Sequence, residues 1–284
     1  VGVYMNISLG IIGGSGVYEL PELKVIEEIK VDTPFGQPSS EVIIGEIDGH
    51  RACFLPRHGK HHQLTPSEVN YRANIFALKS LGVKNIVSVS AVGSLKEEFP
   101  PEKFVLPEQF IDWTKGKRER TFFGNGVVAH VSTAEPVNLE LRERIAKVCT
   151  SEKIDHAKGG SYLCIEGPQF SSKAESHIYR SFGADVIGMT NVPESYLAKE
   201  AAIAYATVAM VTDYDCWKEE HCTLEEIMKV MKNNNLNARK LMAKLVPDLV
   251  KNPVVVEENI LFSILTPKER WTEQQNIFIN VLAR

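Results

Sequence analysis

Cysteine is scarce in this sequence, and its spacing argues against two common uses of the residue. The 284 residues contain five cysteines, and no two of them form a CxxC pair. Zinc sites are usually built from closely spaced cysteine and histidine pairs, and a disulfide framework from an even set. The pattern therefore favours reduced thiols in a cytoplasmic protein. The five residues are Cys53, Cys149, Cys164, Cys216 and Cys222.

Long apolar runs and an excess of one charge are also missing. No run reaches the roughly 20 residues that span a membrane, and the opening VGVYMNISLG has neither the basic nor the hydrophobic region of a signal peptide. The net charge is only −4 in a chain that is 24% charged and 44% hydrophobic. This is the composition of an ordinary globular protein, and its slight acidity argues against a general nucleic-acid binder.

No linker rich in proline, glycine or serine and no repeat divides the chain, so we expect a single domain over residues 1–284. Residues 1–8 would form an N-terminal extension, and 268–284 a C-terminal tail that could be helical. Apolar segments alternate with amphipathic ones, which predicts the α/β class with a central, mostly parallel sheet flanked by helices. The Asp48-Gly49 step favours one antiparallel hairpin, which would make the sheet mixed.

We expect strands at 8–12, 24–31, 41–47, 51–55, 85–91, 104–111, 127–132, 160–166, 185–189 and the start of 208–217. We expect helices at 66–81, 138–150, 172–182, 193–204, 223–246 and 271–284, while 254–265 fits either a strand or a helix. Three of these helices would begin with a capping box, formed by Thr65 with Glu68, Ser172 with Glu175 and Thr272 with Gln275. The charged segment 115–120 is predicted to be a solvated loop.

Two carboxylates follow the apolar run of residues 208–211. Side chains two residues apart in a strand point the same way, so Asp213 and Asp215 should lie side by side at the end of a buried strand. The apolar neighbours Tyr214 and Trp217 would raise a carboxyl pKa by desolvation, and the second carboxylate would raise it further. A protonated acid of this kind can act as a general acid. The alternative is a helix N-cap or an Asx turn that closes the strand.

Two other predicted strand ends suit an anion. Gly13-Gly14-Ser15-Gly16 could let backbone N–H groups approach a phosphate, or it could be only a tight turn. Arg57 and His58 follow another strand, and an arginine offers a planar fork to an oxyanion. The alternatives there are a solvated basic loop and a metal site built from His58, His61 and His62.

Further polar residues follow the remaining strands, at Ser90-Ala91 and Met189-Thr190. Ligands collect at the carboxyl ends of parallel strands. A substrate that needs an oxyanion on one side and a proton on the other would fit this layout. His130, in an alternating segment, is by itself more typical of a structural histidine.

The chain resembles the 5′-methylthioadenosine phosphorylase family, the trimeric branch of the purine nucleoside phosphorylases, over about residues 9–267. The resemblance implies a purine nucleoside phosphorylase-like fold and an assembly of three subunits or of two trimers. The tail beyond Pro267 has no counterpart in the family pattern. The motifs that carry the resemblance are Gly13-Gly14-Ser15-Gly16, Pro56-Arg57-His58-Gly59, Val69-Asn70-Tyr71-Arg72-Ala73-Asn74, Ser90-Ala91-Val92-Gly93-Ser94, Glu166-Gly167-Pro168-Gln169-Phe170-Ser171, Gly188-Met189-Thr190, Val192-Pro193-Glu194 and Thr212-Asp213-Tyr214-Asp215.

The resemblance also implies roles for single residues. Asp213 would face the purine N7, Asp215 would face the 6-amino group, and Met189 would lie along the ribose. The family often has threonine in place of Ser15 and sometimes in place of Ser90, and both changes keep the hydroxyl. The implied phosphate-binding residues are Ser15, Arg57, His58, Ser90, Ala91 and Thr190, with His58 also counted as catalytic. The implied base and methylthio contacts are Phe170, Ser171, Leu224, Ile227 and Met228, with His130 and Leu265 contributed by a neighbouring subunit.

The expected reaction is phosphorolysis of 5′-methylthioadenosine to adenine and 5-methylthioribose 1-phosphate, a step of purine and methionine salvage. Phosphate would be a co-substrate, and neither a metal nor an organic cofactor would be needed. Three alternatives stay open on the sequence. They are a phosphorylase for 6-oxopurine nucleosides, which should carry asparagine at the N7 position, a nucleoside hydrolase, and a purine-binding protein without catalysis.

Overall fold

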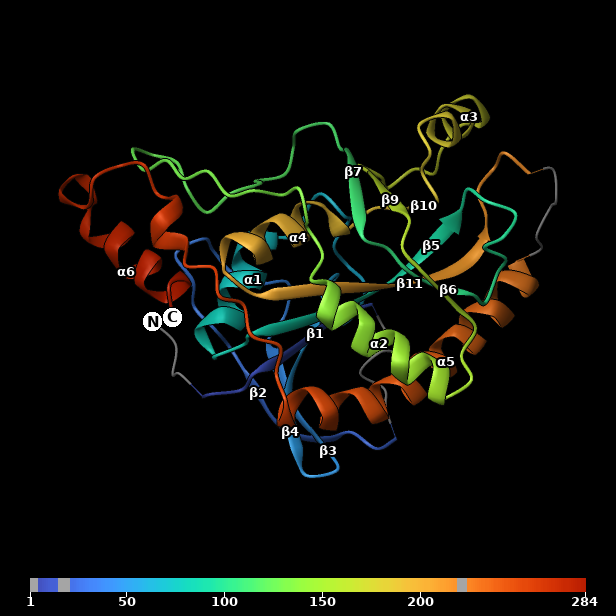
Figure 1. Cartoon of the computed structure of the whole chain (residues 1–284), viewed down its shortest axis with the longest axis horizontal. Coiled ribbons are helices and arrows are strands. Elements are labelled where there is room, and N and C mark those ends of the chain that lie inside the picture. The colour runs from blue at the N-terminus through green and yellow to red at the C-terminus, as the bar shows by residue number, and fades with distance from the viewer. Residues whose placement is uncertain (1–4, 15–20, 219–223) are drawn as a thin grey trace.

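One mixed sheet of eleven strands forms the centre of the protein (Figure 1). The structure is a computed structural model that describes residues 5–14, 21–218 and 224–284. Within these residues, six strand pairings are parallel and four are antiparallel. The predicted α/β class with a mixed, mostly parallel sheet is therefore confirmed.

The strand order is β2-β3-β4-β1-β5-β10-β9-β7, while β11 pairs with both β5 and β6, and β8 pairs with β6. β5 is thus the strand through which the two halves of the sheet and β11 are joined. The strands are β1 (Leu9–Gly13), β2 (Lys24–Ile29), β3 (Val42–Ile47), β4 (His50–Pro56), β5 (Asn85–Ser94), β6 (Phe104–Leu106), β7 (Gln109–Trp113), β8 (His156–Lys158), β9 (Ser161–Ile165), β10 (Val186–Gly188) and β11 (Ala204–Tyr214).

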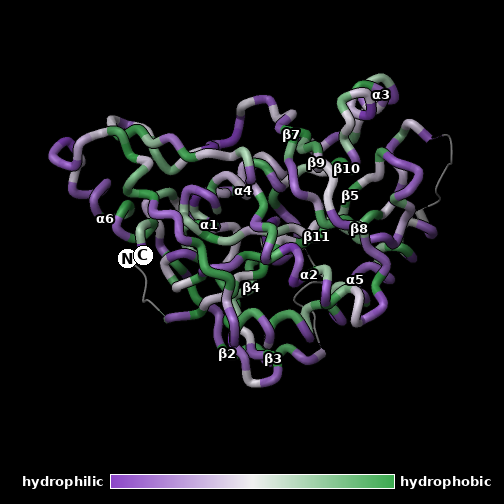
Figure 2. The backbone as a smooth tube through the Cα atoms, viewed as in Figure 1, coloured by the Kyte–Doolittle hydropathy of each residue, from purple (hydrophilic) through white to green (hydrophobic). Residues whose placement is uncertain are grey.

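Helices cover both faces of the sheet (Figure 1). One group packs together as α1, α4 and α6, and the other as α2 and α5, while α3 projects beyond the end of the sheet. Hydrophobic segments are concentrated on the inner strands and hydrophilic ones on the outer loops (Figure 2). The helices are α1 (Tyr71–Ser80), α2 (Leu139–Ser151), α3 (Lys173–Ser181), α4 (Asn191–Glu200), α5 (Leu224–Lys251) and α6 (Glu273–Leu282), with short 3₁₀ turns at Ile260–Ser263 and Lys268–Arg270.

The alternation of side chains along β11 shows how the sheet serves both helix layers. Ala206 and Val208 point into the cluster that contains α2 and α5. Tyr205 points the other way, into the cluster that contains α1, α4 and α6. Both faces are therefore apolar, which explains why this strand appears in the sequence as a nearly continuous hydrophobic run.

Several local predictions are confirmed. Asp48 and Gly49 have φ values of 50° and 76° and join β3 to β4 through the pair Ile47↔His50, as expected for a tight antiparallel hairpin. Ser172 and Glu175 form the capping box of α3, and Thr272 and Gln275 that of α6. No helix in the described part of the chain is long and apolar enough to cross a membrane.

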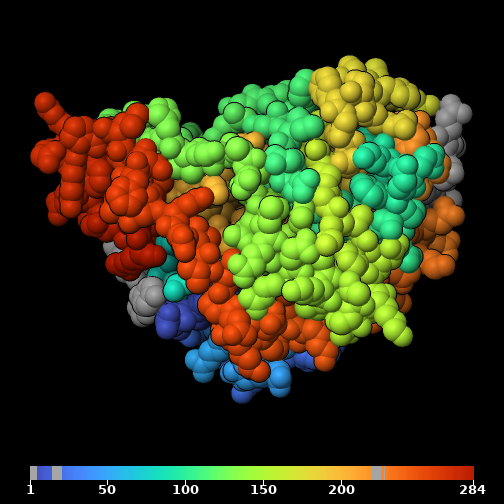
Figure 3. All heavy atoms as spheres, viewed as in Figure 1, coloured from blue at the N-terminus to red at the C-terminus, as the bar shows by residue number. Residues whose placement is uncertain are grey.

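The C-terminal tail is helical and docks on its own chain. Phe278 and Ile279 of α6 are buried in the same cluster as α1, and the ring of Phe278 lies 5.4 Å from that of Phe35. Figure 3 shows this C-terminal part covering one end of the molecule. An isolated helix of this length is marginal in water, so this packing is what stabilises it.

The start of α1 was predicted too early. The hydrogen bonds expected between Thr65 and Glu68 are present, with Thr65 N donating to Glu68 Oε2 over 2.9 Å. They close only a turn, and the helix begins at Tyr71 because the side chain of Asn70 caps it by accepting from Ala73 N. A second N-cap therefore replaces the one that the sequence suggested.

Three further boundaries were wrong. The segment 104–111 is split into β6 and β7 because Pro107 lacks the N–H that a continuous ladder needs. The segment 127–132 forms only isolated bridges, one of them between Ala129 and Ile264. The segment 254–265 is mostly irregular and contains only the 3₁₀ turn, so neither a strand nor an α-helix forms there.

Candidate functional site

The sheet brings the predicted oxyanion and acid groups to the carboxyl-terminal half of β5. Strands β4, β1, β5 and β11 are parallel, so their carboxyl ends lie at the same edge. Ser90 pairs with Ala209 of β11, and Gly93 pairs with Asp213. Three residues of extended chain span about 10 Å, so a sugar-sized gap separates the level of Ser90 from that of Asp213.

A gap in the sheet lies beside this stretch of β5. On the edge away from β11, β1 pairs with β5 only as far as Ser88, and β10 pairs with it only from Gly93 onward. Residues 89–92 therefore have no partner strand on that edge within the described chain. Ala91 is accordingly exposed, although β5 runs through the interior of the sheet. Ligands bind in concave sites, and a break in strand pairing of this kind can provide one.

Met189 and Thr190 lie beside this notch because of an antiparallel strand pairing that the sequence analysis did not predict. β10 is antiparallel to β5, with Ile187 opposite Gly93. Continuing this register places Thr190 level with Ser90, and Ser90 Oγ lies 3.4 Å from Asn191 Oδ1. The prediction that Thr190 lies near Ser90 therefore fits the geometry. The supposed reason, a parallel strand that ends at the same edge, is wrong.

Arg57 lies beneath the notch and is almost fully engaged with protein atoms. Its side chain is 1% exposed. Nε donates to Glu194 Oε2 over 2.6 Å and Nη2 to Glu194 Oε1 over 3.0 Å. Further bonds run to Ser88 Oγ at 2.7 Å and to the carbonyl oxygen of Val89 at 3.2 Å. Of the five N–H donors of an arginine, one on Nη1 has no partner among these bonds.

Charge balance around Arg57 rests on Glu194. Burial by itself lowers the pKa of Arg57, but the Glu194 carboxylate outweighs this and holds the pKa above its ordinary value. Glu194 Oε1 also accepts from Ser88 Oγ at 2.8 Å and from the Tyr205 hydroxyl at 2.9 Å. The arginine is therefore part of a satisfied, nearly neutral network rather than a solvated basic loop.

His58 is held as a neutral imidazole. Its Nδ1 lies 2.9 Å from the carbonyl oxygen of Leu64, so Nδ1 carries the hydrogen and Nε2 is an acceptor. Burial, and then the charge of Arg57, lower the pKa of His58 to about 4. The ring is stacked on that of His62 at 4.5 Å. Among the described residues, no group of three histidine, cysteine or acidic side chains is placed to hold a metal ion.

A β-bulge directs the two carboxylates at the end of β11. The register with β5 shifts between Val211 and Asp213, so Thr212 is the extra residue. Burial raises the pKa of Asp213, and the charge of Asp215 adds to the effect. The pKa of Asp215 is also raised, first by burial. Both directions agree with the expectation from the sequence.

A hydrogen bond from Thr212 opposes this rise in the pKa of Asp213. Thr212 Oγ1 lies 2.6 Å from Asp213 Oδ1 and 3.1 Å from the carbonyl oxygen of Val92. A hydroxyl has a single hydrogen to donate, and donation to Asp213 favours the carboxylate. Burial outweighs this bond, so the pKa of Asp213 stays raised.

Hydroxyl groups without good partners lie at both ends of the site. The Thr190 and Tyr162 hydroxyls are buried and close to each other, yet neither forms a hydrogen bond of good geometry. The same is true of the Ser171 and Ser176 hydroxyls beside Asp215. Buried polar atoms without partners are rare in folded proteins. These four therefore indicate a place where a ligand completes the hydrogen bonding.

The remaining predicted residues are distributed unevenly. Met189 lies against Gly167, whereas Phe170 is 86% exposed and packs against little. Met228 of α5 is 59% exposed, although Leu241 and Leu245 on the same helix are buried. Ser15 and the side chains of Leu224 and Ile227 lie outside the described residues.

His130 and Leu265 lie next to each other but away from the acid pair. His130 N donates to the carbonyl oxygen of Ser263 over 2.9 Å, and Leu265 N donates to that of Val128 over the same distance. Both side chains are exposed. These paired segments are tied to the region of α6, where Trp271 Nε1 donates to the carbonyl oxygen of Thr266 over 2.9 Å. In Figure 1, α6 and the end of β11 are at opposite ends of the molecule, so these side chains do not reach Asp213 of their own chain.

Two buried charged residues were missed by the sequence analysis. Segment 115–120 was predicted to be solvated, but Arg118 is only 6% exposed and its guanidinium contacts the ends of β9 and β10. Glu194 appeared only in the motif Val192-Pro193-Glu194 and at the start of a predicted helix, without a role of its own. One cue was available for it, since an arginine at the end of an apolar strand needs a buried carboxylate. No local cue identified Arg118.

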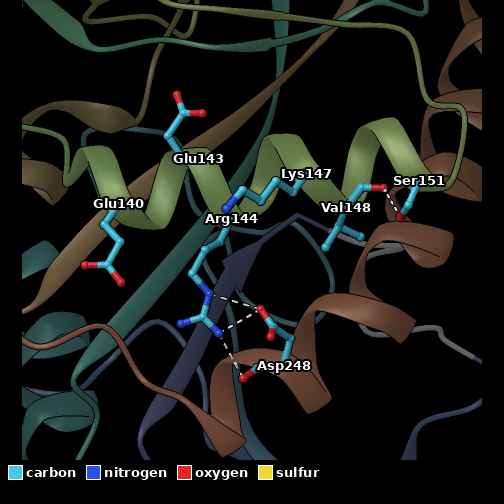
Figure 4. A pocket seen from close by; sticks show the side chains of 7 residues that line it. All are labelled: Glu140, Glu143, Arg144, Lys147, Val148, Ser151 and Asp248. Atoms are coloured by element: carbon cyan, nitrogen blue, oxygen red, sulfur yellow. Dashed lines mark hydrogen bonds and ion pairs between the residues drawn. The ribbon is translucent and has the colours of Figure 1, made fainter.

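A cavity lies elsewhere, between α2 and α5 (Figure 4). Its volume is about 530 Å³, and no predicted site residue lines it. Arg144 Nη2 is paired with Asp248 Oδ2 across it at 2.7 Å, so its central charges satisfy one another. The notch at β5 is the better candidate because its hydroxyls lack good partners.

Comparisons with known proteins identify the family of the chain. A family model described as the phosphorylase superfamily matches residues 8–247. The S-methyl-5′-thioadenosine phosphorylase of Rhodospirillum rubrum is 52% identical over 252 residues, which cover 88% of this chain and 85% of that protein. The corresponding protein of Geobacter sulfurreducens is 51% identical over 236 residues and is covered to 82%, as is this chain. The chain belongs to the S-methyl-5′-thioadenosine phosphorylase family. The resemblance seen in the motifs is thereby confirmed.

Solved structures of this phosphorylase family share the fold. A methylthioadenosine phosphorylase from an antarctic soil metagenomic library is 44% identical, with a TM-score of 0.92 over 98% of this chain and 100% of that one. The Schistosoma mansoni enzyme in complex with tubercidin is 34% identical, with a TM-score of 0.82 over 91% and 99% of the two chains. A variant of the Schistosoma mansoni enzyme, 32% identical, was solved with methylthioadenosine, with a TM-score of 0.82 over 98% and 99%.

Proposed function

We propose that this protein cleaves 5′-methylthioadenosine with inorganic phosphate, giving adenine and 5-methylthioribose 1-phosphate. The observation that carries the proposal is the notch at residues 89–92 of β5, with hydroxyls and a cation at one end and two carboxyls of raised pKa about 10 Å away at the other. The names of the relatives in this family support the choice of nucleoside.

The acid end would act on the base. As the glycosidic bond breaks, electrons move to the purine, and a protonated Asp213 at N7 would neutralise the charge that develops there. The sugar carbon becomes positive, and phosphate attacks it from the opposite face. Asp215, as a carboxylate, would accept a hydrogen bond from the 6-amino group of adenine. No step in this scheme requires a metal or an organic cofactor.

The phosphate end would hold its ligand mainly through hydroxyls. Thr190 has a buried hydroxyl free to donate, and Ser90 and Ala91 lie on the unpaired edge of β5. Arg57 can offer its remaining N–H, so its contribution would be a single hydrogen bond and its charge rather than a bidentate clamp. A neutral His58 would accept a hydrogen bond from a protonated phosphate oxygen. Ser15 would add a donor from the glycine turn.

Assembly into trimers, or into hexamers of two trimers, belongs to the proposal. The exposed side chains of His130 and Leu265, with the neighbouring Phe262 at 90% exposure, form an apolar surface away from their own site. A second copy of the chain would cover this surface and receive these residues in its methylthio pocket, beside Met228. A cytoplasmic location also stays a prediction.

Release of adenine from 5′-methylthioadenosine is expected only when phosphate is present, because the sugar carbon needs the phosphate nucleophile. Chromatography of the products with and without phosphate measures this. Equal adenine release without phosphate would identify a hydrolase, and binding without turnover would identify a purine-binding protein. Either outcome would contradict the proposal.

Asp215→Asn is expected to reduce the preference for 6-amino over 6-oxo nucleosides by about 10- to 100-fold, since mispairing one buried polar group costs about 1–3 kcal/mol. An asparagine can donate to a 6-oxo group, whereas a carboxylate cannot. The measurement is kcat/KM for methylthioadenosine and for methylthioinosine. Asp155→Asn, the same chemical change at a residue that is 67% exposed, serves as a control. An unchanged ratio in Asp215→Asn would exclude the proposed contact.

A further inference from the structure

Arg118 is a buried guanidinium that the proposed reaction leaves without a role. We infer that Arg118 is a positioning residue, which holds the turn of Met189 to Val192 so that the Thr190 hydroxyl faces phosphate. The inference rests on the proposed function, because it assigns Thr190 to the phosphate end of the site.

All five N–H donors of Arg118 point at acceptors on two segments. Nη1 donates to the carbonyl oxygens of Met189 and Val192, each over 2.7 Å. Nη2 donates to the carbonyl oxygen of Glu166 over 2.8 Å, with that of Ile165 at 3.4 Å. Nε donates to Glu166 Oε1 over 3.2 Å. One planar group therefore joins the end of β9 to the turn after β10.

The carbonyls bound by Nη1 bracket Thr190. Val192 has φ −118° and ψ 126°, so the backbone is not helical at the point where α4 begins. Regular secondary structure therefore supplies few hydrogen bonds to this turn. Arg118 binds the carbonyl oxygens of the turn on one side. On the other side, Asn191 Nδ2 donates to the Tyr205 hydroxyl over 2.5 Å.

The Thr190 hydroxyl has no good partner of its own. Its direction is consequently set by the backbone of the turn, which Arg118 and Asn191 hold from opposite sides. A displacement of the turn would move the hydroxyl relative to Ser90 and weaken the hold on phosphate.

The charge of Arg118 is balanced locally, so its effect on phosphate acts through geometry. Glu166 is its partner. Burial by itself would raise the pKa of Glu166, but hydrogen bonds from Ser67 and from Lys115 N, together with the Arg118 charge, outweigh it and lower the pKa. A lysine could keep this charge balance. It lacks the planar fork that reaches Glu166 and both carbonyls of the turn at once.

Arg118→Lys tests the inference, and Arg120→Lys is the matched control. Arg120 lies on the same loop, is 47% exposed and is paired with Asp112. Arg118→Lys is expected to raise the KM for phosphate by about 10-fold or more, the value of one or more lost charge-assisted hydrogen bonds. The affinity for adenine alone should change by less than about twofold, because Asp213 and Asp215 lie on a different strand. Arg120→Lys should change neither quantity.

A structural role alone would give a different result. Arg118→Lys would then unfold at a lower temperature with an unchanged KM for phosphate, and this outcome would overturn the inference. If Arg118→Lys does not fold, Arg118→Ala is assayed with and without low guanidinium concentrations. Recovery of phosphate affinity with guanidinium supports the inference, and no recovery in a folded variant contradicts it. The wild-type protein is assayed alongside, since a wild type that releases no adenine with phosphate refutes the proposed function itself.

Discussion

Asp213→Asn is expected to lower kcat/KM for 5′-methylthioadenosine by about 10²- to 10⁴-fold, the usual contribution of a general acid. The carboxyl is half-buried at the end of β11, and its pKa is raised by this desolvation and by the charge of Asp215. An asparagine keeps the size and one hydrogen-bond donor but cannot give up a proton. The measurement is initial-rate kinetics at saturating phosphate.

The pH dependence and a surface variant provide the checks on this result. A raised pKa means that Asp213 keeps its proton to a higher pH than a free carboxyl, so activity should fall as the pH rises through that pKa. The variant should lose this limb of the profile. Asp155→Asn makes the same chemical change at a residue that is 67% exposed and paired with Lys103, and it should be fully active. Full activity in Asp213→Asn would exclude the acid role.

Glu194→Gln is expected to lower the free energy of unfolding by about 3–5 kcal/mol, because it leaves the charge of Arg57 buried without a counter-charge. Both side chains of the pair are 1% exposed, so water cannot take the place of the lost carboxylate. The amide still has an oxygen for the Tyr205 hydroxyl, which makes the variant a test of charge rather than of shape. Denaturant unfolding measures the change.

Phosphate should partly compensate for this loss. A bound anion near Arg57 supplies the missing charge, and a ligand that binds only the folded state stabilises it. Added phosphate is therefore expected to raise the melting temperature of Glu194→Gln more than that of the wild type. Glu258→Gln removes the carboxylate of a surface pair that is 55% exposed and should be nearly neutral. An equal rise in melting temperature in the variant and the wild type would mean that the bound anion does not balance the charge of Arg57.

The sequence predicts those parts of the site that depend only on residues close together in the chain. Asp213 and Asp215 follow a continuous apolar run, and a strand that ends in two carboxylates gives both their burial and the direction of their pKa shifts. The capping boxes of α3 and α6 could be predicted in the same way, because each is formed by two residues three positions apart.

Features that depend on pairing between distant segments could not be obtained in this way. Nothing in the sequence of β10 indicates that this strand runs antiparallel to β5. Nothing in β1 indicates that its pairing with β5 ends at Ser88, so the notch could not be predicted. Arg118 stands in a segment with the composition of a solvated loop, and only the carbonyls of β9 and of the turn after β10 explain its burial. Such partners are fixed by the fold and not by neighbours in the chain.

The bulge at Thr212 has a consequence for how this active-site strand can change over evolutionary time. Removing Thr212 would leave Asp213 opposite Gly93 in a regular ladder, but it would also remove the local bend and twist that direct the side chains at the end of β11. Both carboxylates would then change direction together. Substitutions at these positions can be tested by selection one at a time, whereas a deletion or an insertion in this stretch would abolish the acid pair in one step.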